Sequence, residues 1–267
     1  MDDPRLKSWW PQYQNKISAN VEPSISKFHS GIFYQEYLRQ IHQVRKPLSY
    51  LEIGVQTGAT LAFAQCPAVA IDPNFQFQWN PVGQRKETYL FQLQSDEFFS
   101  QHDLKKFLPH GIDFAFLDGM HHFEYLLRDF MNTEKFSRKG SIVTLHDCYP
   151  VNAEIANRGE NYNSRTDVTT RDWWAGDVWK LLPIFRDYRP DLNVAILDCP
   201  PTGLVVVRDL DANSDALSGA YKEIVAKYRD VTLERYNIER FRAEFSIANS
   251  RRVFEPDALR KFLTSRT

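Results

Sequence analysis

The chain has 267 residues, of which 43% are hydrophobic and 25% charged, a composition typical of a soluble globular protein. Its 33 basic and 34 acidic residues give a net charge of -1, which offers no reason to expect nucleic acid or an anionic membrane as the main partner. No apolar run approaches the ~20 residues that span a bilayer. The first seven residues lack the apolar core of a signal peptide, and three widely spaced cysteines favour free thiols in a reducing compartment, so we expect a cytoplasmic protein.

Residues 1–47 are predicted to form an N-terminal helical leader. Residues 1–28 are mixed and aromatic-rich, and we expect them to pack against the main domain. Apolar residues at helical spacing predict an amphipathic helix over residues 31–44, and Arg45-Lys46-Pro47 should end it.

Strands then alternate with helices, an order that predicts a parallel, doubly wound sheet. Ser95 is expected to cap the helix after the third strand, and Gly140 to end the helix after the fourth. The predicted strands cover residues 48–53, 68–72, 88–93, 112–117 and 141–145.

The sheet should close in a different way. Residues 193–198 and 204–207 are apolar strands separated by only five residues. Parallel neighbours need a connection of about a dozen residues or more, so this pair must be an antiparallel hairpin. The predicted fold class is therefore α/β: a Rossmann-like three-layer sandwich over residues 48–210, with a mostly parallel, seven-stranded sheet that ends in an antiparallel hairpin.

Residues 211–267 are predicted to be a C-terminal helical extension, with helices over 214–229 and 232–246. The basic end, residues 251–267, is expected to be peripheral. It is a candidate contact in a homo-oligomer.

The stretch of residues 49–60 joins the first strand to a glycine turn and to a helix predicted to begin near Ala59. Backbone N–H groups and the dipole of a helix N-terminus point at the ligand in such an arrangement. Glu52 is a carboxylate within an apolar strand, so its burial is costly unless partners such as ligand hydroxyls or ammonium groups are present. Asp72 ends the second strand 20 residues later, where an acid commonly takes ribose hydroxyls in dinucleotide folds.

The glycine turn itself differs from that of dinucleotide-binding folds. It contains Gly54 and Gly58 but not the Gly-x-Gly-x-x-Gly fingerprint. This spacing and the closing hairpin both count against NAD as the ligand.

Two aspartates end neighbouring strands of the predicted sheet. Asp118 follows the fourth strand and Asp147 the fifth, and neighbouring strands lie ~4.8 Å apart, so the two carboxylates should converge at one edge. Close carboxylates repel unless a cation or a proton lies between them, and Mg²⁺ takes oxygen ligands of this kind. The alternative is that each aspartate caps a helix or pairs with an arginine.

Two histidines accompany these aspartates. His121 lies three residues after Asp118, and an imidazole with a pKa near ~6.5 suits a general base at neutral pH, although an isolated histidine is more often merely solvated. His146 precedes Asp147, but histidine suits Fe, Mn or Zn better than Mg²⁺. Together the two histidines would complete the two-histidine, one-carboxylate set of Fe(II) oxygenases, which keeps that class of enzyme open.

Residues 150–176 form a long polar segment between regular elements, which predicts a functional lid. Trp173 and Trp174 are candidates for an apolar wall over a substrate, whereas Trp179 is expected in the core. Asp177 is expected to cap the helix that follows the lid.

From about residue 30 to residue 210 the chain resembles the class I S-adenosylmethionine-dependent methyltransferases. The resemblance rests on the Glu/Asp-x-Gly-x-x-x-Gly turn, the acid that ends the second strand and the closing hairpin. In that family the turn binds the methyl donor, the acid binds its ribose, and a polar residue after the third strand lies near its adenine. The cofactor-binding residues that this resemblance implies are Glu52, Gly54, Gly58, Asp72, Ser95 and Asp96.

Residues 118–124 and 176–180, with His146-Asp147, resemble a narrower branch that contains macrocin-type and rhamnosyl-type O-methyltransferases. Met120 and His122-Phe123 depart from that branch's pattern. The resemblance implies Mg²⁺-assisted O-methylation of a small-molecule substrate, a sugar, a glycosylated metabolite or another small hydroxylated metabolite. It implies catalytic roles for His121 and Asp118 and metal binding by Asp118, His146 and Asp147. A metal-dependent oxygenase or hydroxylase of a natural product and a non-catalytic cofactor-binding relative remain the alternatives.

Overall fold

The computed structural model describes residues 29–264. The aromatic leader over residues 1–28 and the last three residues lie outside this range, so the expected packing of the leader stays a prediction. In the described part of the chain, no helix is long and apolar enough to cross a bilayer.

One sheet of eight strands organises residues 29–264, in the order β3-β2-β1-β4-β5-β7-β6-β8. β1 pairs in parallel with β2 and β4, and β4 pairs in parallel with β5. β7 runs antiparallel to both of its neighbours, β5 and β6. The strands are β1 (Tyr50–Ile53), β2 (Ala68–Ile71), β3 (Thr88–Phe91), β4 (Ile112–Leu117), β5 (Ser137–His146), β6 (Asn193–Leu197), β7 (Leu204–Arg208) and β8 (Ile247–Ala248).

The Rossmann-like α/β fold and the hairpin of β6 and β7 are confirmed. The predicted number of seven strands is wrong, because β8 of the C-terminal extension pairs in parallel with β6 and adds an eighth strand at that edge.

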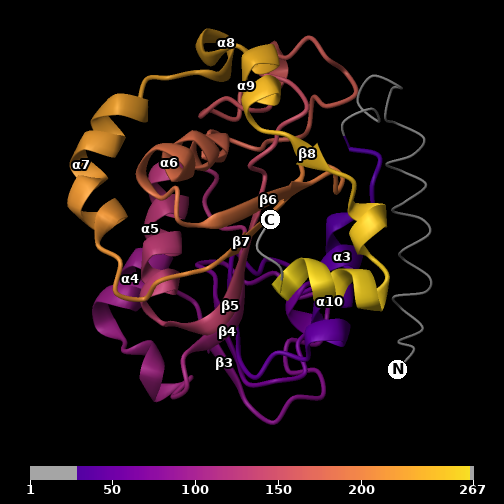
Figure 1. The fold of residues 1–267 in the computed structure, drawn as a ribbon, viewed down its shortest axis with the longest axis vertical. Helices are drawn as coiled ribbons and strands as arrows, with labels where there is room; N and C mark the ends of the chain where they lie inside the picture. Colours follow the sequence, from indigo (N-terminus) through magenta and orange to yellow (C-terminus); the bar gives the residue numbers. More distant parts are fainter. Residues whose placement is uncertain (1–28, 265–267) are drawn as a thin grey trace.

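Helices cover both faces of this sheet, with α4, α5, α6 and α7 on one side and α3 and α10 on the other (Figure 1). Each face has its own apolar cluster, one around Phe130 and Phe185 and the other around Tyr37 and Phe262. The α-helices are α3 (Tyr34–Arg45), α4 (Ser95–Gln101), α5 (Phe123–Lys135), α6 (Leu181–Tyr188), α7 (Ala216–Tyr228), α8 (Leu233–Tyr236), α9 (Ile238–Glu244) and α10 (Pro256–Thr264). Short 3-10 helices are η1 (Leu61–Phe63), η2 (Leu104–Lys106), η3 (Tyr162–Ser164), η4 (Val178–Lys180) and η5 (Ser250–Val253).

The central strand β4 shows why the strands of this sheet have continuous apolar sequences. All six of its residues are buried, since helices cover both faces of the sheet. Its single carboxylate, Asp113, accepts hydrogen bonds from the Arg45 guanidinium at 2.7 Å and from the Leu48 N–H at 2.9 Å. A charge that is buried and paired in this way does not interrupt the strand.

The helix expected after the glycine turn is not formed. Only η1 follows the turn, and the Thr60 hydroxyl before it donates to Glu52 at 2.6 Å rather than capping a helix. A helix of three residues has almost no dipole, so the argument from a helix N-terminus fails at this turn.

Two helix boundaries also differ from the prediction. Ser95 is the first residue of α4, and Gln94 occupies the cap position. α5 ends at Lys135, before Gly140, because β5 already begins at Ser137 and Gly140 lies within that strand with φ +81°.

The described part of the basic end, residues 251–264, is not peripheral. Leu259, Phe262 and Leu263 of α10 are buried in the same cluster as Tyr37 and Ile41 of α3. The helix predicted over residues 232–246 is divided into α8 and α9 at Asn237, which has φ +74°.

Candidate functional site

The turn after β1 is shaped by glycines. Gly54 has φ +84°, and a Cβ at this position would overlap the backbone carbonyl of Asp118. Gly58 has φ +79°, and a Cβ there would lie 2.9 Å from the Phe77 ring. Both positions therefore require glycine, and Gly54 brings the turn into contact with the loop that follows β4.

Glu52 is buried completely beneath this turn. Its two oxygens accept hydrogen bonds from the Thr60 hydroxyl at 2.6 Å and the Tyr50 hydroxyl at 2.7 Å. Burial raises the pKa of Glu52 to about 8, against the opposing effect of the two hydroxyls. The partners that its burial requires thus come from the protein, and Glu52 supports the turn from below.

Asp72 fastens the turn to the end of β2. One carboxylate oxygen accepts from the N–H groups of Val55 and Gln56, both at 2.8 Å, and the other accepts from Asn74 N–H at 2.7 Å. Glu52, Gly54, Gly58 and Asp72 therefore gather at one place, as the sequence predicts.

The residues after β3 lie at the same edge of the sheet but are engaged with other groups. Asp96 forms a two-pronged ion pair with Arg128 of α5, at 2.8 and 2.7 Å. Ser95 hydrogen-bonds to the buried carboxyl of Asp129, whose pKa burial raises to about 7 despite this hydrogen bond. Asp129 is a buried ionisable group that sequence reasoning missed, because it stands at an ordinary helical position.

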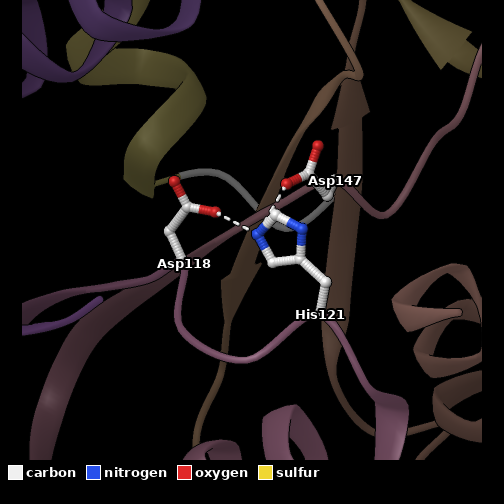
Figure 2. Close-up of side chains that lie close together, drawn as sticks. All are labelled: Asp118, His121 and Asp147. Atoms are coloured by element: carbon white, nitrogen blue, oxygen red, sulfur yellow. Dashed lines mark ion pairs between the residues drawn. The ribbon is translucent and has the colours of Figure 1, made fainter. Parts of the chain in front are cut away.

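Asp118 and Asp147 do converge. They follow β4 and β5, which pair through Leu117 and Leu145. The side chain of His121 points at both carboxylates, with its Nε2 3.1 Å from Asp147 and 3.6 Å from Asp118 (Figure 2). Asp147 has φ +61°, a left-handed conformation that aspartate tolerates, and its carboxylate accepts from the Thr202 hydroxyl at 2.6 Å.

His146 completes the cluster from the buried side. Its Nδ1 lies 3.3 Å from the carboxylates of both Asp118 and Asp147 but in a geometry that makes no hydrogen bond. The ring of Tyr34, from the start of α3, lies over it with the ring centres 4.0 Å apart. The sequence gives no signal for this contact, because Tyr34 is an ordinary aromatic residue near the start of the predicted helix.

The orientation of His121 is fixed by its other nitrogen. Nδ1 lies 2.7 Å from the carbonyl oxygen of Trp174. A carbonyl only accepts, so Nδ1 carries the proton and donates it, which leaves Nε2 facing the carboxylates.

Electrostatics within the cluster are dominated by mutual pairing. Burial by itself lowers the pKa of His121 and His146. The two carboxylates raise it by more, so the resulting pKa is about 9 for His121 and about 10 for His146. Burial raises the pKa of Asp118 and Asp147, but the two imidazoles hold both values below the ordinary range. Protonated imidazoles thus balance the charge of the carboxylates.

The donor set fits a divalent cation. The ligand atoms of Asp118, His121 and Asp147 all lie within 4.8 Å of one another. The resemblance implies Asp118, His146 and Asp147 as the ligands, and the buried Nδ1 of His146 lies 3.3 Å from both carboxylates without a hydrogen bond. His121 Nε2 faces the same two carboxylates, so it can act on a group bound between them.

The tryptophans and Asp177 have different surroundings. Trp179 is fully buried, as expected, and Trp173 packs on a small cluster with Val151 and Ile155. Asp177 does not cap the helix that follows it, since its carboxylate accepts from the Phe123 N–H at the start of α5, at 2.8 Å.

We compared the chain with families of known proteins. Residues 51–148 match a family model described as a methyltransferase domain. The segment begins in β1 and ends just after Asp147. It therefore includes both the glycine turn and the cluster of Asp118, His121, His146 and Asp147, here called the acidic edge. This part of the chain is therefore similar to a methyltransferase domain. A comparison with curated proteins found no match.

Three solved structures with a similar chain path are two O-methyltransferases and one methyltransferase. The O-methyltransferase from Bacillus cereus in complex with SAH is 15% identical, with 78% of this chain and 91% of that chain covered and a TM-score of 0.48. TomG from Streptomyces achromogenes, an O-methyltransferase involved in tomaymycin synthesis and solved with SAM, is 14% identical, with coverages of 70% and 90% and a TM-score of 0.44. The SAH-bound methyltransferase PaMTH1 from Podospora anserina is 12% identical, with coverages of 74% and 95% and a TM-score of 0.45. All three are distant likenesses, at 15% identity or less.

Proposed function

We propose that this chain transfers the methyl group of S-adenosylmethionine to a hydroxyl of a sugar, a glycosylated metabolite or another small hydroxylated metabolite. The observation that carries the proposal is the contact between the two halves of the site. Within a methyltransferase domain, Gly54 of the donor turn packs against the backbone of Asp118, the first residue of the acidic edge. A donor on the turn and an acceptor at the carboxylates would be neighbours.

The donor side would use the glycine turn and its supports. Gly54 and Gly58 give the turn the positive φ angles that it needs, Asp72 lies where ribose hydroxyls would bind, and Glu52 holds the turn in shape from beneath. Ser95 and Asp96 both lie where the adenine would bind, and each would leave its present partner, Asp129 or Arg128, to reach it.

The acceptor side would use the two aspartates and His121. Asp118 and Asp147, with His146 Nδ1 beneath them, would hold a divalent cation such as Mg²⁺, which makes a bound hydroxyl more acidic. Once their charge is balanced, the carboxylates no longer hold the pKa of His121 at about 9. His121 Nε2 would then accept the proton of the acceptor hydroxyl, while Nδ1–H stays bound to Trp174.

The rate would come mainly from positioning, because methyl transfer discharges a sulfonium and needs the acceptor oxygen in line with the methyl group. The narrow resemblance to macrocin-type and rhamnosyl-type enzymes supports a sugar-like acceptor. Trp174, half-buried beside His121 with ring centres 5.1 Å apart, offers an aromatic face to sugar C–H groups.

Calorimetry tests the donor assignment directly. The protein should bind S-adenosylhomocysteine, and Gly58→Arg should abolish the binding, whereas Gly219→Arg on an open face of α7 should not affect it. Methyl transfer from labelled S-adenosylmethionine to a panel of sugars and glycosides, with and without EDTA, then tests the acceptor and the cation. Failure of the unchanged protein to bind the cofactor product would sink the proposal.

A metal-dependent oxygenase is the second candidate, because His121 and His146 lie together with Asp118 and Asp147, a composition compatible with Fe(II) oxygenases. Tight binding of 2-oxoglutarate with Fe(II), and none of S-adenosylhomocysteine, would decide for it.

A further inference from the structure

The segment of residues 150–176 is joined to the loop that carries His121 by hydrogen bonds at several points. His121 Nδ1–H donates to the Trp174 carbonyl, and the Trp174 indole N–H donates to the Asn157 carbonyl at 2.9 Å. The neighbouring His122 contacts the Arg158 carbonyl through its Nε2 at 3.1 Å. The carbonyls of Asn157 and Arg158 thus hold Trp174 and His122, the two residues on either side of the contact that sets the tautomer of His121.

Arg158 is also the residue that fixes this part of the segment to the rest of the protein. Its Nη1 lies 2.7 Å from Glu124 in the first turn of α5 and 2.9 Å from Asp177. Both carboxylates are largely buried, with side chains 11% and 4% exposed, whereas the arginine side chain is 39% exposed. The guanidinium closes the network from the solvent side.

Asp177 brackets the same loop. Its N–H donates to the His121 carbonyl at 3.0 Å, and its carboxylate accepts from the Phe123 N–H. Lys180, which is buried, pairs with this carboxylate at 2.8 Å. Asp177 therefore keeps one cation when Arg158 is replaced, so such a variant should still fold.

We propose that Arg158 is a positioning residue for His121. It acts through the Asn157 carbonyl, the Trp174 indole and the Trp174 carbonyl, and it holds the imidazole with Nδ1–H bound and Nε2 facing the two carboxylates. The assignment rests on the proposed function only for the role of the imidazole, since the contacts themselves are independent of any reaction.

The test follows the two ring N–H groups rather than turnover. In protein labelled with ¹⁵N-histidine and ¹⁵N-tryptophan, NMR should show slow hydrogen exchange for His121 Nδ1–H and for the Trp174 indole N–H. Arg158→Met should make both exchange about tenfold faster or more, because the charged hydrogen bonds that restrain the segment are lost. Arg158→Lys, which keeps the charge, should restore most of the protection.

Arg171→Met is the matched control, since Arg171 lies exposed in the same segment and its side chain takes part in none of the contacts named above. It should leave both ring signals unchanged. Unchanged exchange in Arg158→Met, or equal acceleration in Arg171→Met, would overturn the assignment. Binding of S-adenosylhomocysteine, measured on the same samples, should be unaffected by either variant. Absence of that binding in the unchanged protein would count against the proposed function and leave the exchange result standing.

Discussion

Glu52→Gln should change the way in which the stability of this protein depends on pH. The carboxyl of Glu52 is buried completely, and burial raises its pKa to about 8 from an ordinary value of 4.5. The folded protein therefore keeps this proton between pH 4.5 and 8, whereas the unfolded chain loses it. Because the folded state binds more protons in that window, the free energy of unfolding falls as the pH rises.

The size of the effect follows from the shift in pKa. Each unit between the folded and unfolded values contributes about 1.4 kcal/mol, so the loss between pH 4.5 and 8 is at most roughly 5 kcal/mol. The loss is complete above pH 8. Glutamine has nearly the shape of the protonated acid but cannot ionise, so the variant should lack this dependence. The Tyr50 and Thr60 hydroxyls can rotate to serve an amide.

Urea unfolding of both proteins at pH 5.5, 7 and 8.5 measures the difference. The free energy of unfolding of Glu52→Gln, relative to the unchanged protein, should increase steadily with pH by several kcal/mol. Glu234→Gln, at an exposed position of α8, should show no such trend. A difference that stays constant with pH would refute the argument that this carboxyl is protonated in the folded state.

Three further substitutions probe other parts of the structure. His42 is buried, neither ring nitrogen has a hydrogen-bond partner, and burial lowers its pKa to about 3. The unchanged protein should therefore lose stability as the pH falls from 6.5 toward 3. In urea unfolding, His42→Phe should lose less, by about 1.4 kcal/mol per pH unit. Gly54→Ala should cost at least about 2 kcal/mol in thermal unfolding and abolish calorimetric binding of S-adenosylhomocysteine, because its Cβ meets the Asp118 backbone. Asp147→Asn keeps a residue that tolerates φ +61° but removes one charge, so Mn²⁺ binding measured by paramagnetic resonance should weaken about tenfold or more while S-adenosylhomocysteine still binds. Unchanged Mn²⁺ affinity in that variant would remove Asp147 from the cation site.

The convergence of Asp118 and Asp147 is predictable from the sequence, since each is the acid at the end of a buried strand and parallel neighbours end at one edge. The same logic places Asp72 beside the glycine turn. These predictions succeed because hydrophobic runs reveal strands and strand order restricts where their ends can lie.

Contacts made by irregular segments are not predictable in this way. The Asp177 carboxylate serves the first turn of α5, 54 residues earlier in the chain, and not the helix that follows it. The Trp174 carbonyl that orients His121 lies 53 residues away from it. A backbone carbonyl in a loop has no residue type to mark it, so neither periodicity nor spacing signals such a contact. The missing helix after the turn has a similar origin, since Thr60 is a plausible cap by type and is instead taken by Glu52.

Two glycines far apart in the sequence hold the loop after β4 between the two halves of the site. Gly54 has no Cβ where the Asp118 carbonyl lies, and Gly176, with φ +62°, has none where the His121 carbonyl lies. The glycine turn after β1 thus meets the loop at Asp118, and Gly176 meets it three residues later, at His121. Because the loop is so short, a displacement at either glycine must move both Asp118 and His121. In the proposed reaction, the geometry that would join donor to acceptor therefore depends on the absence of a Cβ at Gly54 and Gly176 as much as on the presence of Asp118, His121, His146 and Asp147.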